Sequence, residues 1–107
     1  MHRTQFSDRE RRRRSRLSQI IHQARFLRGA LSLRNIRCGK SGCCCAQGEL
    51  HACLYLVRRR GGKLRQLFVP RQWEGRIREA VKNHQEMEQL IEELSDLEWK
   101  RLKERKE

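Results

Sequence analysis

The stretch Leu54–Val69, LYLVRRRGGKLRQLFV, decides the fold of this 107-residue chain. Two runs rich in large apolar residues, at 54–59 and 64–69, are separated by the sequence RGGK. Glycine adopts positive φ without steric cost, so the paired glycines suit a tight turn between antiparallel strands. We therefore predict a two-stranded β-hairpin that ends at Pro70. Because an isolated hairpin is only marginally stable in water, it must pack on another part of the chain or on a partner.

All five cysteines lie immediately upstream of this hairpin, between Cys38 and Cys53. In a reducing compartment such crowding favours a metal site over disulfides. Four candidate ligands fall on 14 residues, with glycines between them that permit tight turns: Cys38, Cys43, Cys45 and His51. Zn²⁺ binds thiolates and imidazoles in a tetrahedron, and a site with all four positions filled is structural. Cys53 is an alternative fourth ligand in place of His51.

The chain upstream of the cysteines predicts a basic amphipathic helix and a short extended segment. Ser7 and Glu10 match the S-x-x-E capping box, in which each side chain bonds the other residue's backbone amide, so the helix begins there. Its apolar residues recur at three- and four-residue steps, and the helix is expected to end near Gly29. These residues are Leu17, Ile20, Ile21, Ala24 and Leu27. Residues 31–37 partly alternate between apolar and polar side chains, which indicates the extended segment.

Residues 71–107 contain no proline and one glycine, which predicts a single helix of roughly 30 residues. A repeat of three and four residues forms one seam along it: Ile77, Ala80, His84, Met87, Ile91 and Leu94. Beyond Leu97 the seam turns polar at Glu98 and Arg101. The seam within residues 77–97 suits packing against the first helix, a homodimer or a helical protein partner, in the manner of a short coiled coil.

These elements place the chain in the α+β class. We expect an N-terminal helix, a zinc-stapled cysteine loop that leads into the two-stranded hairpin, and a long C-terminal helix. Three segments follow from this order. Residues 1–16 form a basic arm with the start of the helix, residues 17–70 hold the rest of the helix, the cysteine-rich loop and the hairpin, and residues 71–107 form the C-terminal helix.

Positive charge is concentrated before the end of the hairpin. The chain holds 26 Lys and Arg against 13 Asp and Glu; residues 1–37 and 38–70 carry net charges of +9 and +5, whereas residues 71–107 carry −1. Such segregation attracts polyanions and predicts a nucleic-acid partner, with DNA preferred to RNA. The candidate phosphate contacts are Arg11, Arg12, Arg13, Arg14 and Arg16 in the first helix and Arg58, Arg59, Arg60, Lys63 and Arg65 on the hairpin.

Few aromatic residues lie in the basic segments, and we expect most of them in the core: Phe6, Phe26, Tyr55 and Phe68. Proteins that stack bases usually interleave aromatic residues with the basic ones. The predicted mode is therefore phosphate contact with little readout of base sequence.

Several functions are disfavoured by what the sequence lacks. No apolar run approaches the roughly 18 residues of a membrane helix, and no signal-peptide pattern is present, so we expect neither a membrane span nor secretion. No Ser-His-Asp order, glycine-rich phosphate loop or pair of carboxylates indicates an enzyme. Glu49 is the only acidic residue between Cys38 and Pro70, which leaves zinc catalysis without a general base. We therefore expect a non-enzymatic cytoplasmic protein.

The cysteine segment and the hairpin resemble a small bacterial family of unknown function. Its pattern is CGKxxCxCAxGxxHGxYY, followed by a Gly-Gly-Lys hairpin, a Val-Pro step and a long C-terminal helix. The resemblance covers this chain from about Gly29 to Lys100 and selects as shared positions Cys38, Cys43, Cys45 and His51. It implies a bacterial protein that is often found near mobile genetic elements and is sometimes labelled transposase-associated, with no assigned activity.

This chain departs from the family pattern at two places. Ala52-Cys53-Leu54 replaces Gly-Pro-Tyr after the histidine, so the turn out of the loop differs and Cys53 competes for the metal. Cys44 and Cys53 are peculiar to this chain. The arginine-rich segment before Leu17 lies outside the resemblance, so its nucleic-acid role is predicted from charge alone.

The expected function is non-enzymatic binding of nucleic acid by an accessory protein that carries a structural Zn²⁺. Two alternatives are open. In the first, the chain is a protein–protein adaptor that acts through the C-terminal helix. In the second, it is a redox- or metal-responsive switch. The cysteines also allow an iron–sulfur centre or thiols that bind no metal, although their cramped spacing disfavours the cluster.

Overall fold

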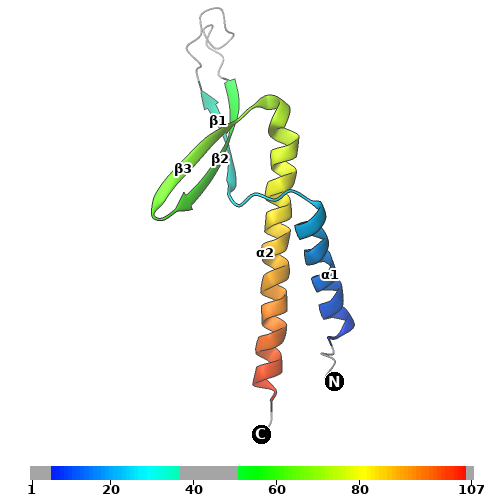
Figure 1. The fold of residues 1–107 in the computed structure, drawn as a ribbon. Coiled ribbons are helices and arrows are strands. Elements are labelled where there is room, and N and C mark those ends of the chain that lie inside the picture. Colours follow the sequence, from blue (N-terminus) through cyan, green and yellow to red (C-terminus); the bar gives the residue numbers. More distant parts are fainter. Residues whose placement is uncertain (1–5, 37–50, 106–107) are drawn as a thin grey trace, which may run out of the picture. The chain divides into compact units, whose positions relative to one another are not determined.

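The computed structural model describes residues 6–36 and 51–105, and it confirms the α+β class. In chain order the elements are helix α1 (Asp8–Gln23), strands β1 (Ala30–Ile36), β2 (His51–Arg60) and β3 (Lys63–Val69), the short 3₁₀ helix η2 (Arg71–Trp73) and helix α2 (Glu74–Lys103) (Figure 1). They group into two units. The sheet unit spans Leu27–Val81, and the helical unit holds the residues up to Phe26 and from Lys82 onward. The single long C-terminal helix that the sequence predicts is confirmed as α2, with 30 residues.

The three strands form one antiparallel sheet in the order β1-β2-β3. β1 pairs with the first part of β2, from Ala30 opposite Val57 to Ile36 opposite His51. The sequence predicted a two-stranded hairpin with only a short extended segment before it, so the third strand is a correction. The partner of that segment, in β2, follows it in the sequence only after residues 37–50, and such long-range pairing leaves no local signal in the sequence.

The apolar core of the sheet unit is small. Its buried apolar side chains are Leu54 and Val69, which lie directly opposite each other in β2 and β3, and Ala80 and Val81 in α2. Other large apolar residues of the strands stay exposed: Leu33, Leu64, Leu67 and Phe68. The expectation that most aromatic residues of the basic segments lie in the core is therefore wrong for Phe68, and also for Phe26, which is exposed after α1.

The β2–β3 turn confirms the prediction made from the paired glycines. Gly61 and Gly62 have φ values of 60° and 79°. These are the left-handed values of a type I′ turn, which other residues adopt only at a steric cost. The turn joins Arg60 to Lys63, which pair across the two strands. The glycines thus fix the register of the hairpin.

Helix α1 begins as predicted and ends earlier. The Ser7 hydroxyl accepts a hydrogen bond from the Glu10 amide at 3.2 Å, which is one half of the predicted capping box. The other half is a wrong prediction, because the Glu10 carboxylate binds arginines instead. The helix ends at Gln23, whereas the sequence indicated an end near Gly29.

Tertiary bonds explain the early end of α1. Ala24 is already extended, and the Arg25 carbonyl accepts a hydrogen bond from the Asn83 side-chain amide at 2.9 Å. Two residues later the Leu27 amide donates to the Ala80 carbonyl at 3.0 Å. These bonds satisfy backbone groups that a longer helix would have paired internally, so the apolar periodicity overstates the length of the helix.

In the helical unit, α1 packs antiparallel to the C-terminal part of α2 (Figure 1). The buried cluster and the residues packed against it are Ile20, Met87, Leu90, Leu17 and Ala24. Of the three roles predicted for the seam of residues 77–97, packing against the first helix is therefore observed at Met87 and Leu90. A homodimer and a helical partner stay predictions. No helix within residues 6–36 and 51–105 is long and apolar enough to cross a membrane.

Candidate nucleic-acid interface

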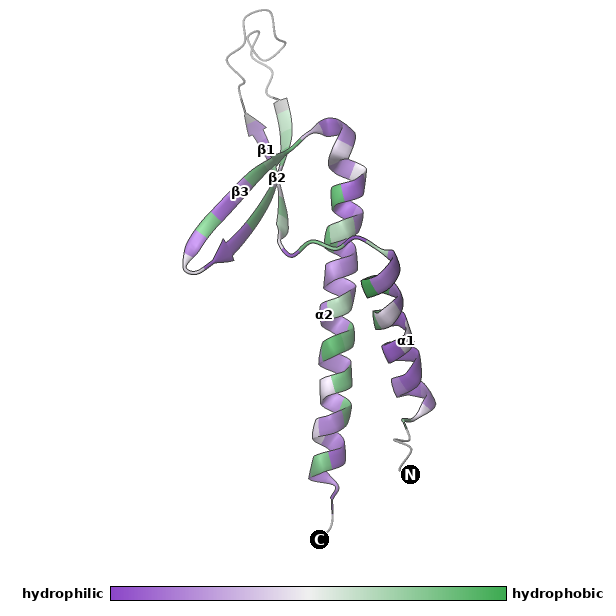
Figure 2. Ribbon diagram, in the orientation of Figure 1, coloured by the Kyte–Doolittle hydropathy of each residue, from purple (hydrophilic) through white to green (hydrophobic). Residues whose placement is uncertain are grey.

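The end of the β2–β3 hairpin forms a two-stranded ribbon. β1 begins opposite Val57, so residues 58–65 have no third strand beside them. All of these residues are exposed except Arg58, which is half-buried. In Figure 2 the end of β2 at this turn has the colour of hydrophilic residues. We call residues 58–65 the hairpin tip.

Four basic residues of the hairpin tip share one face of the ribbon. Arg58 lies directly opposite Arg65, and Arg60 lies directly opposite Lys63. Residues in opposing or alternate positions of a sheet project to the same side, and like charges in direct opposition are destabilising. The tip therefore carries a concentrated repulsion that an anionic ligand would relieve.

No acidic residue on the strands neutralises this charge. β1, β2 and β3 contain no Asp or Glu, and no ion pair joins a tip residue to another residue of the described ranges. The Nε atom of Arg58 is buried and lacks a hydrogen-bond partner among the described residues. A guanidinium nitrogen removed from water without an acceptor is costly, and the Arg58 side chain would have to turn outward for a phosphate oxygen to become that acceptor.

Arg59 lies on the opposite face of the ribbon. It pairs with Leu64, and its neighbours Arg58 and Arg60 project to the other side because strand residues alternate. The sequence placed all five basic residues of the hairpin in one set. The structure brings together four of them and separates Arg59.

Two arginines that the sequence proposed as phosphate contacts bind glutamates of α2. Arg13 Nε lies 2.6 Å from Glu93 Oε1. Arg16 donates from Nε and Nη2 to the two carboxylate oxygens of Glu86, at 2.7 and 2.9 Å. Each pair joins α1 to α2 within the helical unit. These two side chains are therefore already engaged with anions of their own chain.

Glu10 is the buried centre of an ion-pair group whose arginines are about half exposed. Its carboxylate is fully buried and accepts hydrogen bonds from Arg101 Nη2 at 2.7 Å and from Arg14 Nε at 3.3 Å. Burial by itself raises the pKa of Glu10, but the hydrogen bonds and charges of Arg101 and Arg14 outweigh burial and lower the pKa. The group joins the start of α1 to the end of α2, and it engages Arg14, a third predicted phosphate contact.

Sequence reasoning missed this group, although a signal exists. Glu10 lies seven residues before Leu17 and therefore on the same side of the helix as the apolar stripe. Arg101 lies where the seam of the C-terminal helix becomes polar. An acidic residue at the end of one apolar stripe and a basic residue at the end of the other indicate an ion pair between the two helices. The capping pattern explained Glu10 locally and obscured this second role.

Arg11 and Arg12 differ from the other three arginines of α1 that the sequence predicted as phosphate contacts. Both are exposed, and neither forms an ion pair with any residue in the described parts of the chain. They are the predicted α1 contacts that stay available to an external anion.

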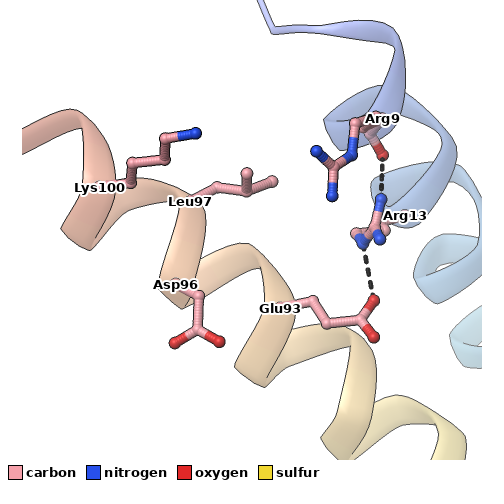
Figure 3. A pocket seen from close by; sticks show the side chains of 6 residues that line it. All are labelled: Arg9, Arg13, Glu93, Asp96, Leu97 and Lys100. Atoms are coloured by element: carbon pink, nitrogen blue, oxygen red, sulfur yellow. Dashed lines mark hydrogen bonds and ion pairs between the residues drawn. The ribbon is translucent and has the colours of Figure 1, made fainter.

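A pocket of about 370 Å³ lies in the helical unit beside Arg13 (Figure 3). Its lining residues are Arg9, Arg13, Glu93, Asp96, Leu97 and Lys100. Figure 3 shows Arg13 between the Arg9 carbonyl, at 3.1 Å, and Glu93. Because acidic and basic groups are mixed in its wall, this pocket does not favour a polyanion.

Most of the predicted zinc ligands lie outside the residues that the structure describes. Cys38, Cys43 and Cys45 lie outside the described residues, and His51 is the first residue of β2, opposite Ile36. Cys53, the alternative ligand, is half-buried in β2 and forms no disulfide. The described ranges, which omit 37–50, contain no cluster of three His, Cys, Asp or Glu side chains that could hold a metal ion. The zinc site stays a prediction.

Residues 6–79 match a protein family described as Domain of unknown function (DUF6788). The chain belongs to this family. The matched part includes Arg11–Arg14, which the resemblance seen in the sequence had left outside, and it ends within α2. DUF6788 is thus a family of unknown function, as the resemblance implied. No curated protein and no solved structure matches the chain.

Proposed function

We propose that this DUF6788 protein binds nucleic acid without catalysis, through phosphate contacts at the hairpin tip. The observation that carries the proposal is the two pairs of opposed like charges, Arg58 with Arg65 and Arg60 with Lys63, on strands that contain no acidic residue. Arginine and lysine bind phosphate through charge-assisted hydrogen bonds. A bound polyanion relieves the repulsion at the tip and releases counterions from its own phosphates, which favours binding.

The arginines of α1 have unequal roles in this proposal. Arg11 and Arg12 are exposed and supply additional phosphate contacts. Arg13, Arg14 and Arg16 would first have to leave Glu93, Glu10 and Glu86, so they contribute less. The expected preference for DNA, the cytoplasmic location and the setting near mobile genetic elements are part of the same proposal.

A structural Zn²⁺ also belongs to the proposal. Ile36 and His51, which flank residues 37–50 in the sequence, are paired in the sheet, which supports a site shared by Cys38 and His51. Such a metal would stabilise the start of the hairpin. Metal analysis of protein purified without added metal should find about one Zn²⁺ per chain. Protein that folds and contains no zinc would contradict this part of the proposal.

Binding is measured by fluorescence anisotropy with a labelled DNA duplex, a labelled DNA single strand and a labelled RNA, over about 0.05 to 0.2 M salt. The test variant is Arg60→Gln/Lys63→Gln in the hairpin tip. The matched control is Lys100→Gln/Lys103→Gln in the last turn of α2, which removes the same net charge. We expect the tip variant to lose affinity and to reduce the salt slope by about 1 to 2, because each lost phosphate contact removes roughly one counterion.

The control variant should keep the slope of the natural sequence. Equal losses in the two double variants would mean that net charge alone, and not the tip, attracts the polymer. No binding of any of the three polymers at micromolar protein would overturn the proposal entirely.

A further inference from the structure

The face of the sheet that carries Arg59 also carries an aromatic pair. Tyr55 and Phe68 lie directly opposite each other in β2 and β3. Their ring centroids are 5.8 Å apart with an interplanar angle of 71°, an edge-to-face arrangement. Tyr55 is half-buried, whereas Phe68 keeps 56% of its surface exposed. An aromatic ring is thus held in a fixed orientation and presented to solvent.

Arg34 on β1 completes this face. Its guanidinium carbon lies 4.6 Å from the centroid of the Tyr55 ring, a cation–π contact. Its Nε atom donates to the Ser32 hydroxyl at 3.3 Å. These contacts restrict the guanidinium and leave N–H donors for a further acceptor. We call Arg34, Tyr55, Arg59 and Phe68 the aromatic face.

A pocket of about 300 Å³ adjoins Phe68 at the open end of the hairpin, beside the start of β2 and the end of β3. Apart from Arg71 and Glu74, its wall consists of apolar or weakly polar side chains, including Leu54 and Val69. A planar ring that packs on Phe68 therefore has beside it a largely apolar recess whose wall also carries one cation, Arg71, and one anion, Glu74.

The aromatic face matches a ligand that is both anionic and aromatic. Arg34 and Arg59 are basic, no strand carries an acidic residue, and the exposed ring favours contact with another apolar surface. A polynucleotide with unpaired bases combines these properties. In a duplex each base is covered on both faces by its neighbours, so only unpaired bases can stack on a protein ring.

We infer that the aromatic face stacks unpaired bases of a single-stranded nucleic acid while Arg59 of the hairpin tip and Arg34, which lie on the same face, bind its phosphates. This inference rests on the proposed function and names its substrate class. It replaces the expectation of phosphate contact alone, which assumed that Phe68 lies in the core. DNA and RNA single strands share the chemistry that the face recognises.

The test compares three probes on the full chain: oligo-dT, oligo-U of the same length and a mixed-sequence DNA duplex. Phe68→Leu removes the ring and keeps apolar bulk beside Tyr55. Phe68→Tyr restores a ring. Leu67→Ala is the control, because Leu67 is 66% exposed at the adjacent position on the opposite face. Thermal unfolding of each variant confirms that it is folded.

We expect the natural sequence to bind at least one single strand more tightly than the duplex. Phe68→Leu should weaken single-strand binding by about tenfold, in line with the loss of one stacked base, without changing the salt slope. Phe68→Tyr should restore most of that affinity, and Leu67→Ala should have no such effect. The stronger of oligo-dT and oligo-U identifies the polymer.

Two results would overturn the inference and are distinguishable from each other. If the duplex binds most tightly and Phe68→Leu binds all probes like the natural sequence, the hairpin tip binds phosphates and the aromatic face stacks nothing. The proposed function then stands alone. If no probe binds at micromolar protein, the proposed function fails together with the inference.

Discussion

Glu10 links the chemistry of one residue to the stability of the helical unit. Its pKa is lowered, because hydrogen bonds and charges of Arg101 and Arg14 outweigh the effect of burial. The pKa of Glu86 is lowered by its hydrogen bond from Arg16. A carboxylate whose pKa is lower in the folded state stabilises the fold above its ordinary pKa, near 4.5, and this contribution is lost as the pH falls through the folded-state value.

We therefore predict that acid destabilises the helical unit. The thermal midpoint, followed by circular dichroism, should fall as the pH drops below about 4.5. Glu10→Gln should lower the midpoint at neutral pH and make its dependence on acid shallower, because Arg101 and Arg14 lose their charged partner. Glu92→Gln, at an exposed position of α2, is the control. It should change neither the midpoint at neutral pH nor the dependence of the midpoint on acid. A midpoint that is independent of acid in the natural sequence would contradict the prediction.

Gly29 is a second residue whose role depends on its surroundings. Its φ is +152°, and an added Cβ would lie 2.8 Å from Leu56 Cδ1 and 3.1 Å from the Val57 carbonyl oxygen. We predict that Gly29→Ala lowers the free energy of unfolding by about 1–2 kcal/mol, as measured by chemical denaturation. Gly75→Ala is a control for which we expect the opposite effect. Gly75 lies in α2 with open space around it, and alanine there should stabilise the helix by up to about 1 kcal/mol. Equal effects of the two substitutions would refute this account of Gly29.

At the scale of elements, the contact of α1 with α2 depends on a small apolar cluster. Ile20 is 1% exposed and packs with Met87 and Leu90, whereas the adjacent Ile21 is about half exposed. We predict that Ile20→Ala costs about 2–5 kcal/mol of stability in denaturant unfolding. Ile21→Ala removes the same atoms from an exposed position and should cost less than about 1 kcal/mol. Similar losses for both would mean that α1 does not pack through Ile20.

Local signals predicted the elements that depend on neighbouring residues. The paired glycines predicted the β2–β3 turn, and the long segment with a single glycine and no proline predicted α2. The position of β1 as a third strand could not be predicted, because its partner lies across the segment 37–50. The end of α1 was missed for a similar reason: the Asn83 side chain, far along the sequence, binds the Arg25 carbonyl.

The sequence predicted which basic residues belong to the candidate site, but only part of how they are arranged. The run of basic residues identified the hairpin tip, but strand alternation places Arg59 on the other face. The partners of Arg13 and Arg16 are Glu93 and Glu86, 80 and 70 residues away, so charge counting overestimated how many arginines of α1 are available. The exposure of Phe68 was not predictable, because an apolar residue in a strand is usually assigned to the core.

At the scale of the whole molecule, the two units use their charge differently. The helical unit contains both signs, and four of its arginines bind glutamates within the unit: Arg13, Arg14, Arg16 and Arg101. In the described part of the sheet unit, the acidic residues are Glu74 and Glu79 of α2, and the strands have none. The net charge of +13 is therefore least compensated on the sheet, which is where we place the nucleic-acid interface.

The most direct test of that placement is a titration of the isotope-labelled full chain with oligo-dT, oligo-U and a short DNA duplex, followed through the backbone amide NMR spectrum. The account predicts that, with a polymer that binds, the largest shift changes lie at residues 58–65, with smaller changes in α1. Changes confined to α1 and the C-terminal half of α2, or no changes at millimolar concentration of any polymer, would contradict it.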